Sequence, residues 1–138
     1  MNMDKFIRLH NSDDNGMIVV NTDVIIAIVA FRENGRSTSK IYLDTCCSLA
    51  PFIVNETPAL IIQPDNKEFI TMHEITTNDV VVIRKDEISV IDTVSVSASG
   101  RNLKSKLYFC GNSELKPIIV HESAEKIMNQ LNEEVENK

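Results

Sequence analysis

The sequence predicts a mainly β protein of the α+β class, built from two tandem, pseudo-symmetric five-stranded modules and a C-terminal amphipathic helix. Three observations lead to this prediction. The same pattern of residues occurs twice, short β-branched runs alternate with turn formers, and one stretch near the C-terminus has helical periodicity. The first module covers residues 1–62, a linker covers 63–68 and the second module covers 69–138.

The two halves of the sequence match at a constant offset, interrupted by one insertion. Residues 6–31 have eight identical counterparts at an offset of 63, beginning with Phe6 and Phe69. After an insertion of three residues near 97–100, residues 39–62 have nine identical counterparts at an offset of 66. These 17 identities over 50 paired positions indicate that each half is a copy of one small module. One copy would be only marginally stable alone, so we expect the halves to pack on each other.

Strand-like runs separated by turn formers define the first copy. Lys5–His10 alternates apolar and polar residues, as a half-buried strand does. Asn11–Gly16 consists of turn formers and ends in Asn-Gly, a strong signal for a tight hairpin into a second strand at Met17–Val20. Val24–Phe31 is almost entirely apolar, which predicts a strand buried on both faces. We expect this run and residues 88–94 to be the most buried strands, related by a pseudo-two-fold rotation.

The rest of the first copy predicts two further strands and about one turn of helix. Arg32–Thr38 is a polar turn, and strands are expected at Lys40–Leu43 and Pro51–Val54. Thr57-Pro58 supplies an N-cap and a first helical residue, and Gln63-Pro64 ends the helix. The second copy repeats the strands in the same order, at Phe69–His73, Val80–Ile83, Glu87–Val96, Lys106–Phe109 and Lys116–Val120.

The helix of the second copy is not cut short. Ser123 suits its N-cap, and apolar residues then recur at helical spacing. They form one stripe, made of Ala124, Ile127, Met128, Leu131 and Val135. Ala59–Ile62 of the first copy is too short to cover the equivalent sheet, so we expect the C-terminal helix or another subunit to cover it. Uncovered apolar surface favours association, and we expect a homo-oligomer or an obligate place in a larger assembly.

Composition restricts the class of protein. A net charge of −6 argues against a generic binder of phosphate backbones, which would need a clustered basic face. The odd number of cysteines (Cys46, Cys47 and Cys110) is interpreted as buried free thiols in a reducing compartment. The N-terminus lacks the apolar core of a signal peptide, and no run approaches the length of a membrane span. We expect a cytoplasmic location, or a virion assembled inside a cell.

No residue is assigned a catalytic, cofactor-binding or metal-ligating role, and no cofactor is expected. His10 and His73 occupy equivalent strand ends, which leaves a pseudo-symmetric pair open, whereas His121 suits a strand-to-helix connection. The repeated carboxylates are interpreted as turn-forming and helix-capping residues; they are Asp23/Asp86 and Glu56/Glu122. The sequence contains no glycine-rich phosphate loop, no Cys-x-x-Cys pair and no His-Glu-x-x-His motif. An enzyme that uses the three histidines is therefore the least supported class.

One pattern of residues marks both copies. In the first copy it reads Asn21, Asp23, Ile25, Ile28, then Val54, Glu56, Thr57. In the second copy it reads Arg84, Asp86, Ile88, Ile91, then Val120, Glu122, Ser123. This order resembles the small flagellar-motility proteins of the FlbD/SwrD type, and the resemblance implies a non-enzymatic module of a kind found in bacterial and phage proteins. Members of that family are single modules, whereas this chain is a tandem fusion with a shortened first helix.

These observations leave more than one class of function open. The leading expectation is a non-catalytic interaction or assembly protein with protein partners, such as an accessory structural component of a bacterial or phage complex. The alternative is a regulatory protein that binds nucleic acid through a basic group in the second copy, made of Arg84, Lys85, Arg101, Lys104 and Lys106. Nucleic acid is not favoured, because two tyrosines and no tryptophan supply few surfaces on which bases could stack. No membrane partner is expected.

Overall fold

The computed structural model describes residues 6–33, 35–44, 50–63, 65–95, 103–112 and 114–132. Cys46, Cys47, Arg101 and Val135 lie outside the described residues. Within the described ranges the chain forms ten strands, two short 3₁₀ turns and two α-helices. The predicted mainly β, α+β class is therefore confirmed.

The first module is a hairpin, a 3₁₀ turn, a three-stranded meander and one turn of helix. These elements are β1 (Phe6–His10), β2 (Met17–Asn21), η1 (Thr22–Val24), β3 (Ile25–Glu33), β4 (Arg36–Leu43), β5 (Phe52–Val54) and α1 (Pro58–Ile61). The β1–β2 hairpin turns at Asn15, whose φ of 61° is the left-handed conformation that asparagine tolerates. Gly35, with φ of 80°, serves the same purpose between β3 and β4.

The second module repeats this order with a longer helix. Its elements are β6 (Phe69–His73), β7 (Val80–Arg84), η2 (Lys85–Glu87), β8 (Ile88–Ser95), β9 (Leu103–Phe109), β10 (Ile118–Val120) and α2 (Ala124–Asn132). The pairing register is repeated as well: Ile7 lies opposite Val20, and Ile70 lies opposite Ile83. A β-bulge even recurs at the same place, at the start of β3 and of β8. The duplication seen in the sequence is thus a duplication of strand pairing.

Each module closes partly into a barrel, because the end of the first strand meets the last strand. The N–H of Asn55 donates to the His10 carbonyl at 2.8 Å, and in the second module the N–H of His121 donates to the His73 carbonyl at 2.9 Å. Isolated bridges at Asn11 and Glu74 extend these contacts. The strand order around the first module becomes β2-β1-β5-β4-β3. Its two outer edges are β2 and β3, and those of the second module are β7 and β8.

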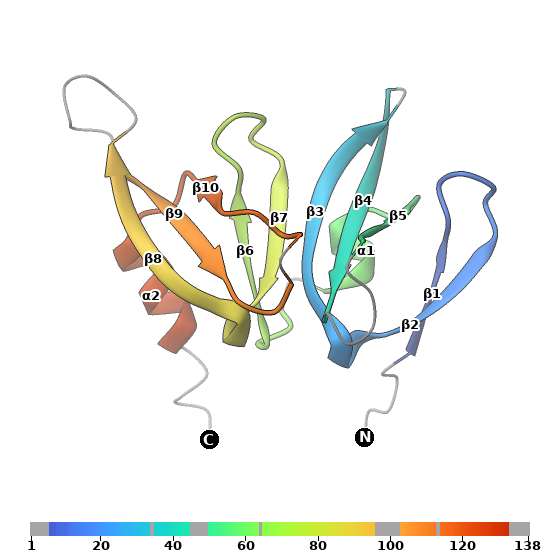
Figure 1. Cartoon of the computed structure of the whole chain (residues 1–138), viewed down its shortest axis with the longest axis horizontal. Helices are drawn as coiled ribbons and strands as arrows, with labels where there is room; N and C mark the ends of the chain where they lie inside the picture. The colour runs from blue at the N-terminus through green and yellow to red at the C-terminus, as the bar shows by residue number, and fades with distance from the viewer. Residues whose placement is uncertain are drawn as a thin grey trace.

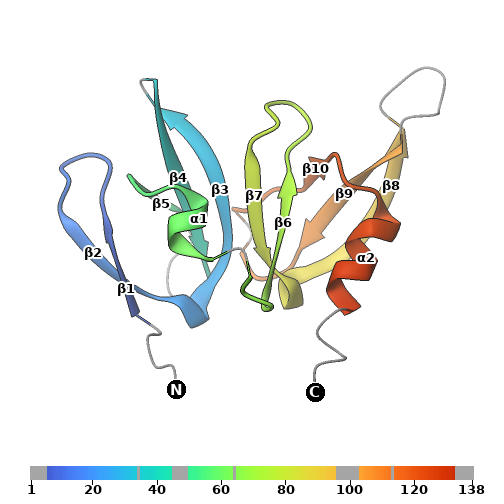
Figure 2. The ribbon, with the colours of Figure 1, turned by 180° about the vertical axis from the view of Figure 1, so that it is seen from behind.

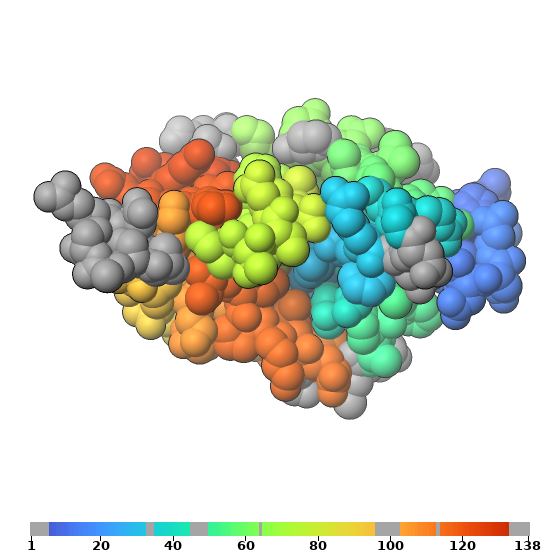
Figure 3. Space-filling model, turned by 90° about the horizontal axis from the view of Figure 1, so that it is seen from above, coloured from blue at the N-terminus to red at the C-terminus, as the bar shows by residue number. Residues whose placement is uncertain are grey.

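The two modules join through one of these edges each. Strand β3 pairs antiparallel with β7, placing Ala27 opposite Ile83 and Ile28 opposite Val82. This makes one five-stranded sheet of order β5-β4-β3-β7-β6 across the middle of the molecule (Figure 1). The β1–β2 hairpin and the β8–β9 strands lie at opposite ends, as the view from behind also shows (Figure 2). From above, the molecule is elongated, with the hairpin forming one tip (Figure 3).

The apolar cores of the modules share residues across this junction. Phe69 and Val82 of the second module pack in the core of the first, beside Ile61 of α1. Ile26 and Ala27 of the first module pack in the core of the second. The expectation that α2 covers the first-module sheet is wrong, because Ile127 and Leu131 of α2 pack in the second core. The alternative, that another subunit covers it, stays a prediction.

Two further expectations are corrected. Strand β8 is not among the most buried strands, because β9 alone pairs with it within the described ranges; the buried strand of the second module is β7. The modules are also not related by a two-fold rotation. A two-fold axis that pairs β3 with β7 would pair β8 with β2 as well, and those strands belong to separate sheets.

Candidate interaction surface

The outermost strands of the molecule, β2 and β8, each have one unpaired edge among the described residues. Strand β2 pairs with β1 alone, and β8 pairs with β9 alone. An unpaired edge presents backbone N–H and C=O groups that can accept another strand. We therefore treat these two edges as the candidate functional site of the chain.

The internal repeat gives each edge a paired counterpart with which it can be compared. Val19 on β2 is 52% exposed, whereas its counterpart Val82 on β7 is 3% exposed. Val90 on β8 is 52% exposed, whereas its counterpart Ala27 on β3 is fully buried. Met17, near the start of β2, adds a further exposed apolar side chain. In each of these two pairs of counterparts, the residue at the internal junction is covered and the residue at the end of the molecule is exposed.

One charged side chain fastens the internal junction. Arg84, at the end of β7, donates from Nε to the Ile25 carbonyl at 2.8 Å, and a terminal guanidinium nitrogen bonds the Thr22 carbonyl. The guanidinium also lies 4.5 Å from the ring centre of Phe69 and 3.2 Å from Oε1 of Glu68. The first two bonds cross from the second module to the first. Hydrogen bonds to a charged donor are among the stronger ones in proteins.

A second polar contact and a glycine complete the junction. Asn112, a buried residue of the second module, donates from its side-chain nitrogen to the Leu43 carbonyl of the first module at 2.7 Å. Gly111 precedes it, and a Cβ at this position would lie 2.2 Å from Oε1 of Glu87 in the same module and 2.4 Å from Cδ1 of Ile26 in the first module. A larger residue there would therefore displace these two side-chain ends. The junction is a built interface with both polar and steric fit.

A carboxylate holds each barrel closed at the end of its first strand. Glu56 accepts from the backbone N–H of His10 at 2.9 Å, and its other oxygen lies 2.7 Å from His10 Nδ1. Glu122 binds His73 in the same way, at 3.1 Å and 2.8 Å. Partial burial opposes ionisation of both glutamates, but the hydrogen bonds from the histidines outweigh it, and each pKa lies below its ordinary value.

These contacts correct the interpretation of the repeated glutamates as helix caps. A buried serine supports each one, since Ser39 donates to the Glu56 carbonyl at 2.7 Å and Ser105 donates to the Glu122 carbonyl at 2.8 Å. The sequence does carry a signal for this arrangement, because all three residue types are retained in both copies. The arrangement ties the strand ends together, and each serine hydroxyl donates to a backbone carbonyl instead of to the histidine ring, so we interpret it as structural. His121 lies between β10 and α2, in the predicted connection.

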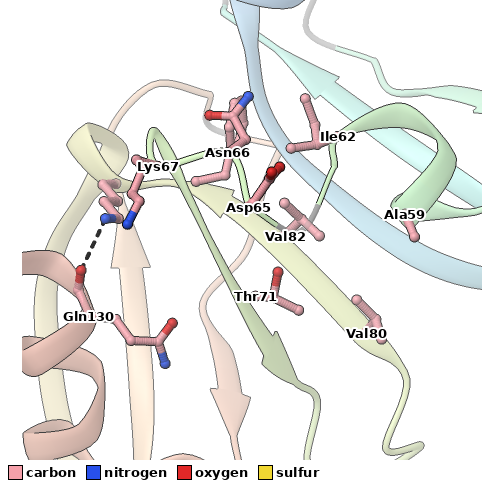
Figure 4. Close-up of a pocket in the computed structure, with 11 residues that line it drawn as sticks. Ala59, Ile62, Asp65, Asn66, Lys67, Thr71, Val80, Val82 and Gln130 are labelled. Atoms are coloured by element: carbon pink, nitrogen blue, oxygen red, sulfur yellow. Dashed lines mark hydrogen bonds between the residues drawn. The ribbon is translucent and has the colours of Figure 1, made fainter. Parts of the chain in front are cut away.

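A groove of about 370 Å³ lies between the two helices, over strands β6 and β7 (Figure 4). Its floor is apolar and includes Ile62 and Val82, and its rim is polar. Lys85 crosses one end, where its Nζ donates to the Gln130 carbonyl at 3.0 Å. The groove is open, and its titratable lining residues are Asp65, Lys67 and Lys85. We regard it as a consequence of the short α1, which leaves β6 and β7 partly uncovered.

Of the basic residues singled out in the sequence, Arg101 lies outside the described residues, and two of the others are bonded within the chain. Arg84 is used at the junction, and Lys85 is bound to α2. Lys106 stands over the ring of Tyr108 on β9, 5.3 Å from its centre. Cys110 is exposed, so the expectation of a buried thiol is wrong for this residue. Within the described part of the chain, no three His, Cys, Asp or Glu side chains are grouped as metal ligands.

Neither helix in the described ranges is long and apolar enough to cross a membrane.

Comparisons of the sequence with family models and curated proteins, and of the fold with solved structures, gave no match.

Proposed function

We propose that this protein is a non-catalytic interaction and assembly protein that acts through its strand edges. The observation that supports the proposal most directly is the contrast between equivalent positions. Val82 and Ala27 are covered where β7 and β3 pair, whereas Val19 and Val90 are exposed on β2 and β8. Strand addition at such an edge uses backbone hydrogen bonds for affinity and alternate side chains for specificity. An accessory structural component of a bacterial or phage complex would use a surface of this kind.

The alternative of a nucleic-acid-binding regulator has less support. Two of its five basic residues, Arg84 and Lys85, donate to backbone carbonyls within the chain. A phosphate-binding surface needs such side chains gathered on one accessible face. A mobility shift with DNA or RNA that weakens steeply as salt is raised would favour this alternative over the assembly role.

The size of the native complex tests the proposed function. The protein would be tagged and produced in the cells that naturally make it, and its sedimentation in a fresh lysate would be measured. We expect wild type to sediment faster than a monomer, and the double variant Val19→Lys/Val90→Lys to return towards the monomer position. Leu60→Lys is the matched control, because Leu60 is exposed on α1 and lies on neither edge. A wild-type protein that sediments as a monomer would contradict the proposed function.

A further inference from the structure

The junction between the modules is head-to-tail, which leaves an identical pair of edges unused. It joins the β3 edge of the first module to the β7 edge of the second. In the repeat, β8 corresponds to β3 and β2 corresponds to β7. The two unused edges are therefore of the two kinds that already pair inside the chain. They lie at opposite ends of the molecule, so they cannot meet within one copy (Figure 1).

We propose that β8 of one chain pairs antiparallel with β2 of a second copy, in the register of the internal junction. This inference rests on the proposed function and names its partner. Subtracting 63 from the β7 positions and adding 63 to the β3 positions gives the register. In the intermolecular pair, Val90 lies opposite Val20, Ile91 opposite Val19 and Asp92 opposite Ile18. The side chains that this pairing covers include Val19 and Val90, the two exposed valines described above.

The intermolecular junction is weaker than the internal one. Asn21 stands where β7 has Arg84, and its side chain accepts from the N–H of Asp23 in its own chain instead of reaching across. Strand β8 also has Ser89 and Asp92 where β3 has Ile26 and Val29. The intermolecular pairing therefore lacks a counterpart of the Arg84 hydrogen bonds and part of the apolar contact. We expect a reversible association that depends on concentration.

A contact between two different surfaces propagates until it closes on itself. Each chain offers one β2 edge and one β8 edge, so every added copy restores both. Such heterologous contacts make rings when the rotation closes and filaments when it does not. Wild type should therefore form a series of species rather than stop at a symmetric dimer, unless two chains suffice to close the ring.

Two complementary edge variants test the head-to-tail geometry. Val19→Lys blocks β2 and leaves β8 intact, and Val90→Lys does the reverse; both positions are exposed, so folding is preserved. By light scattering at about 0.5 mM, where even millimolar dissociation constants register, we expect wild type and Leu60→Lys to associate and each edge variant to stay monomeric. An equimolar mixture of the two variants should form a two-chain species and nothing larger. A monomeric wild type, or a mixture that stays monomeric, would overturn the proposal.

Engineered cysteines test the register. In a chain whose native cysteines are replaced by serine, Val19→Cys and Ile91→Cys would be prepared separately, mixed and oxidised. Ile28→Cys/Val82→Cys in one chain is the control, because these residues lie opposite each other at the internal junction. Opposite residues of paired strands come close enough for a disulfide with small adjustments. We expect a mixed disulfide between the two proteins; a predominance of Val19→Cys homodimers would contradict the head-to-tail arrangement.

The two levels of the proposal fail differently. A purified chain that stays monomeric, together with a large complex in the native lysate that depends on Val19 and Val90, would overturn self-association. It would then assign the edges to another protein. A monomer in the native lysate would overturn the assembly function itself.

Discussion

At the scale of single residues, Glu56 and Glu122 link the stability of the barrels to pH. Hydrogen bonds from the histidines hold the pKa of each glutamate below its ordinary value of 4.5 in the folded chain. The stabilisation they give is therefore complete above the pKa of the unfolded chain, and it is lost as pH falls through the folded pKa. Glu74 has a lowered pKa as well, through hydrogen bonds from Thr76 and Thr77. Acid therefore destabilises the fold through Glu74 as well as through Glu56 and Glu122.

The variant Glu56→Gln/Glu122→Gln isolates the contribution of these two carboxylates to the free energy of unfolding. At neutral pH we expect it to be less stable than wild type by about 1–3 kcal/mol, because a charged acceptor is replaced by a neutral one at both sites. Urea unfolding curves measured from pH 7 down to about pH 3 should converge as wild-type glutamates become protonated. Glu125→Gln, on the exposed face of α2, should follow wild type throughout. A gap that stays constant with pH would contradict the assigned pKa direction.

Arg84 gives a second prediction at this scale. Arg84→Met keeps much of the side chain's apolar contact but removes the bonds to the Ile25 and Thr22 carbonyls. We expect a loss of about 2–3 kcal/mol in the free energy of unfolding, because these bonds have a charged donor. Arg8→Met is the control, since Arg8 is exposed on β1. Equal stability of the two variants in urea would show that Arg84 does not fasten the junction.

At the scale of elements, the two helices begin at equivalent positions but with unequal caps. The Ser123 hydroxyl accepts from the N–H of Lys126 at 3.2 Å, as predicted for an N-cap. Thr57 occupies the predicted cap position of α1 but makes no such side-chain bond. We expect Ser123→Ala to cost about 1 kcal/mol and Thr57→Ala less than about 0.5 kcal/mol, measured by urea unfolding. Equal costs would contradict the difference between the two caps.

The strands and helices could be predicted from the sequence, whereas the pairing of strands from different modules could not. Alternation in 6–10, Asn15 at a turn and the apolar run after Asp23 each correspond to a feature of the fold. The pairing of β3 with β7 was not predictable, because backbone hydrogen-bonding groups are alike on every strand edge. The equivalent positions 19 and 82 are also both valine. Arg84 in place of Asn21, and Ile26 and Val29 in place of Ser89 and Asp92, were the visible signs that the equivalent edges differ.

The candidate edges followed only from the observed pairing. The sequence suggested association, but it placed the uncovered surface at the short α1 and gave no indication of unpaired edges at the ends of the molecule. It offered the C-terminal helix or another subunit as the cover. In the structure the hairpin β6–β7 serves both halves, with Phe69 and Val82 in the first core. Long-range sharing of this kind depends on the path of the chain through 63–68, which local patterns do not specify.

At the scale of the whole molecule, the shared cores make the two modules one folding unit. Because Val82 packs in the first core and Ala27 in the second, neither module can open without exposing apolar surface of the other. We expect amides of β4 and β9 to exchange with solvent hydrogen at the same free energy, and Arg84→Met to lower both equally. Loss of β9 before β4, or a urea transition in two steps, would contradict this expectation.

The contrast between Val19 and Val82 also has a consequence for the evolution of the gene. One ancestral position now exists twice, and natural selection acts on the two copies through different neighbours. At position 82, polar replacements are selected against because they would disrupt the internal junction. At position 19 a single chain gives no reason to keep an apolar residue, because that side chain faces outward in the described structure. Drift to polar residues at 19 and 90 among descendants would show that these edges face water. Retention of apolar residues at both would indicate that another chain covers them.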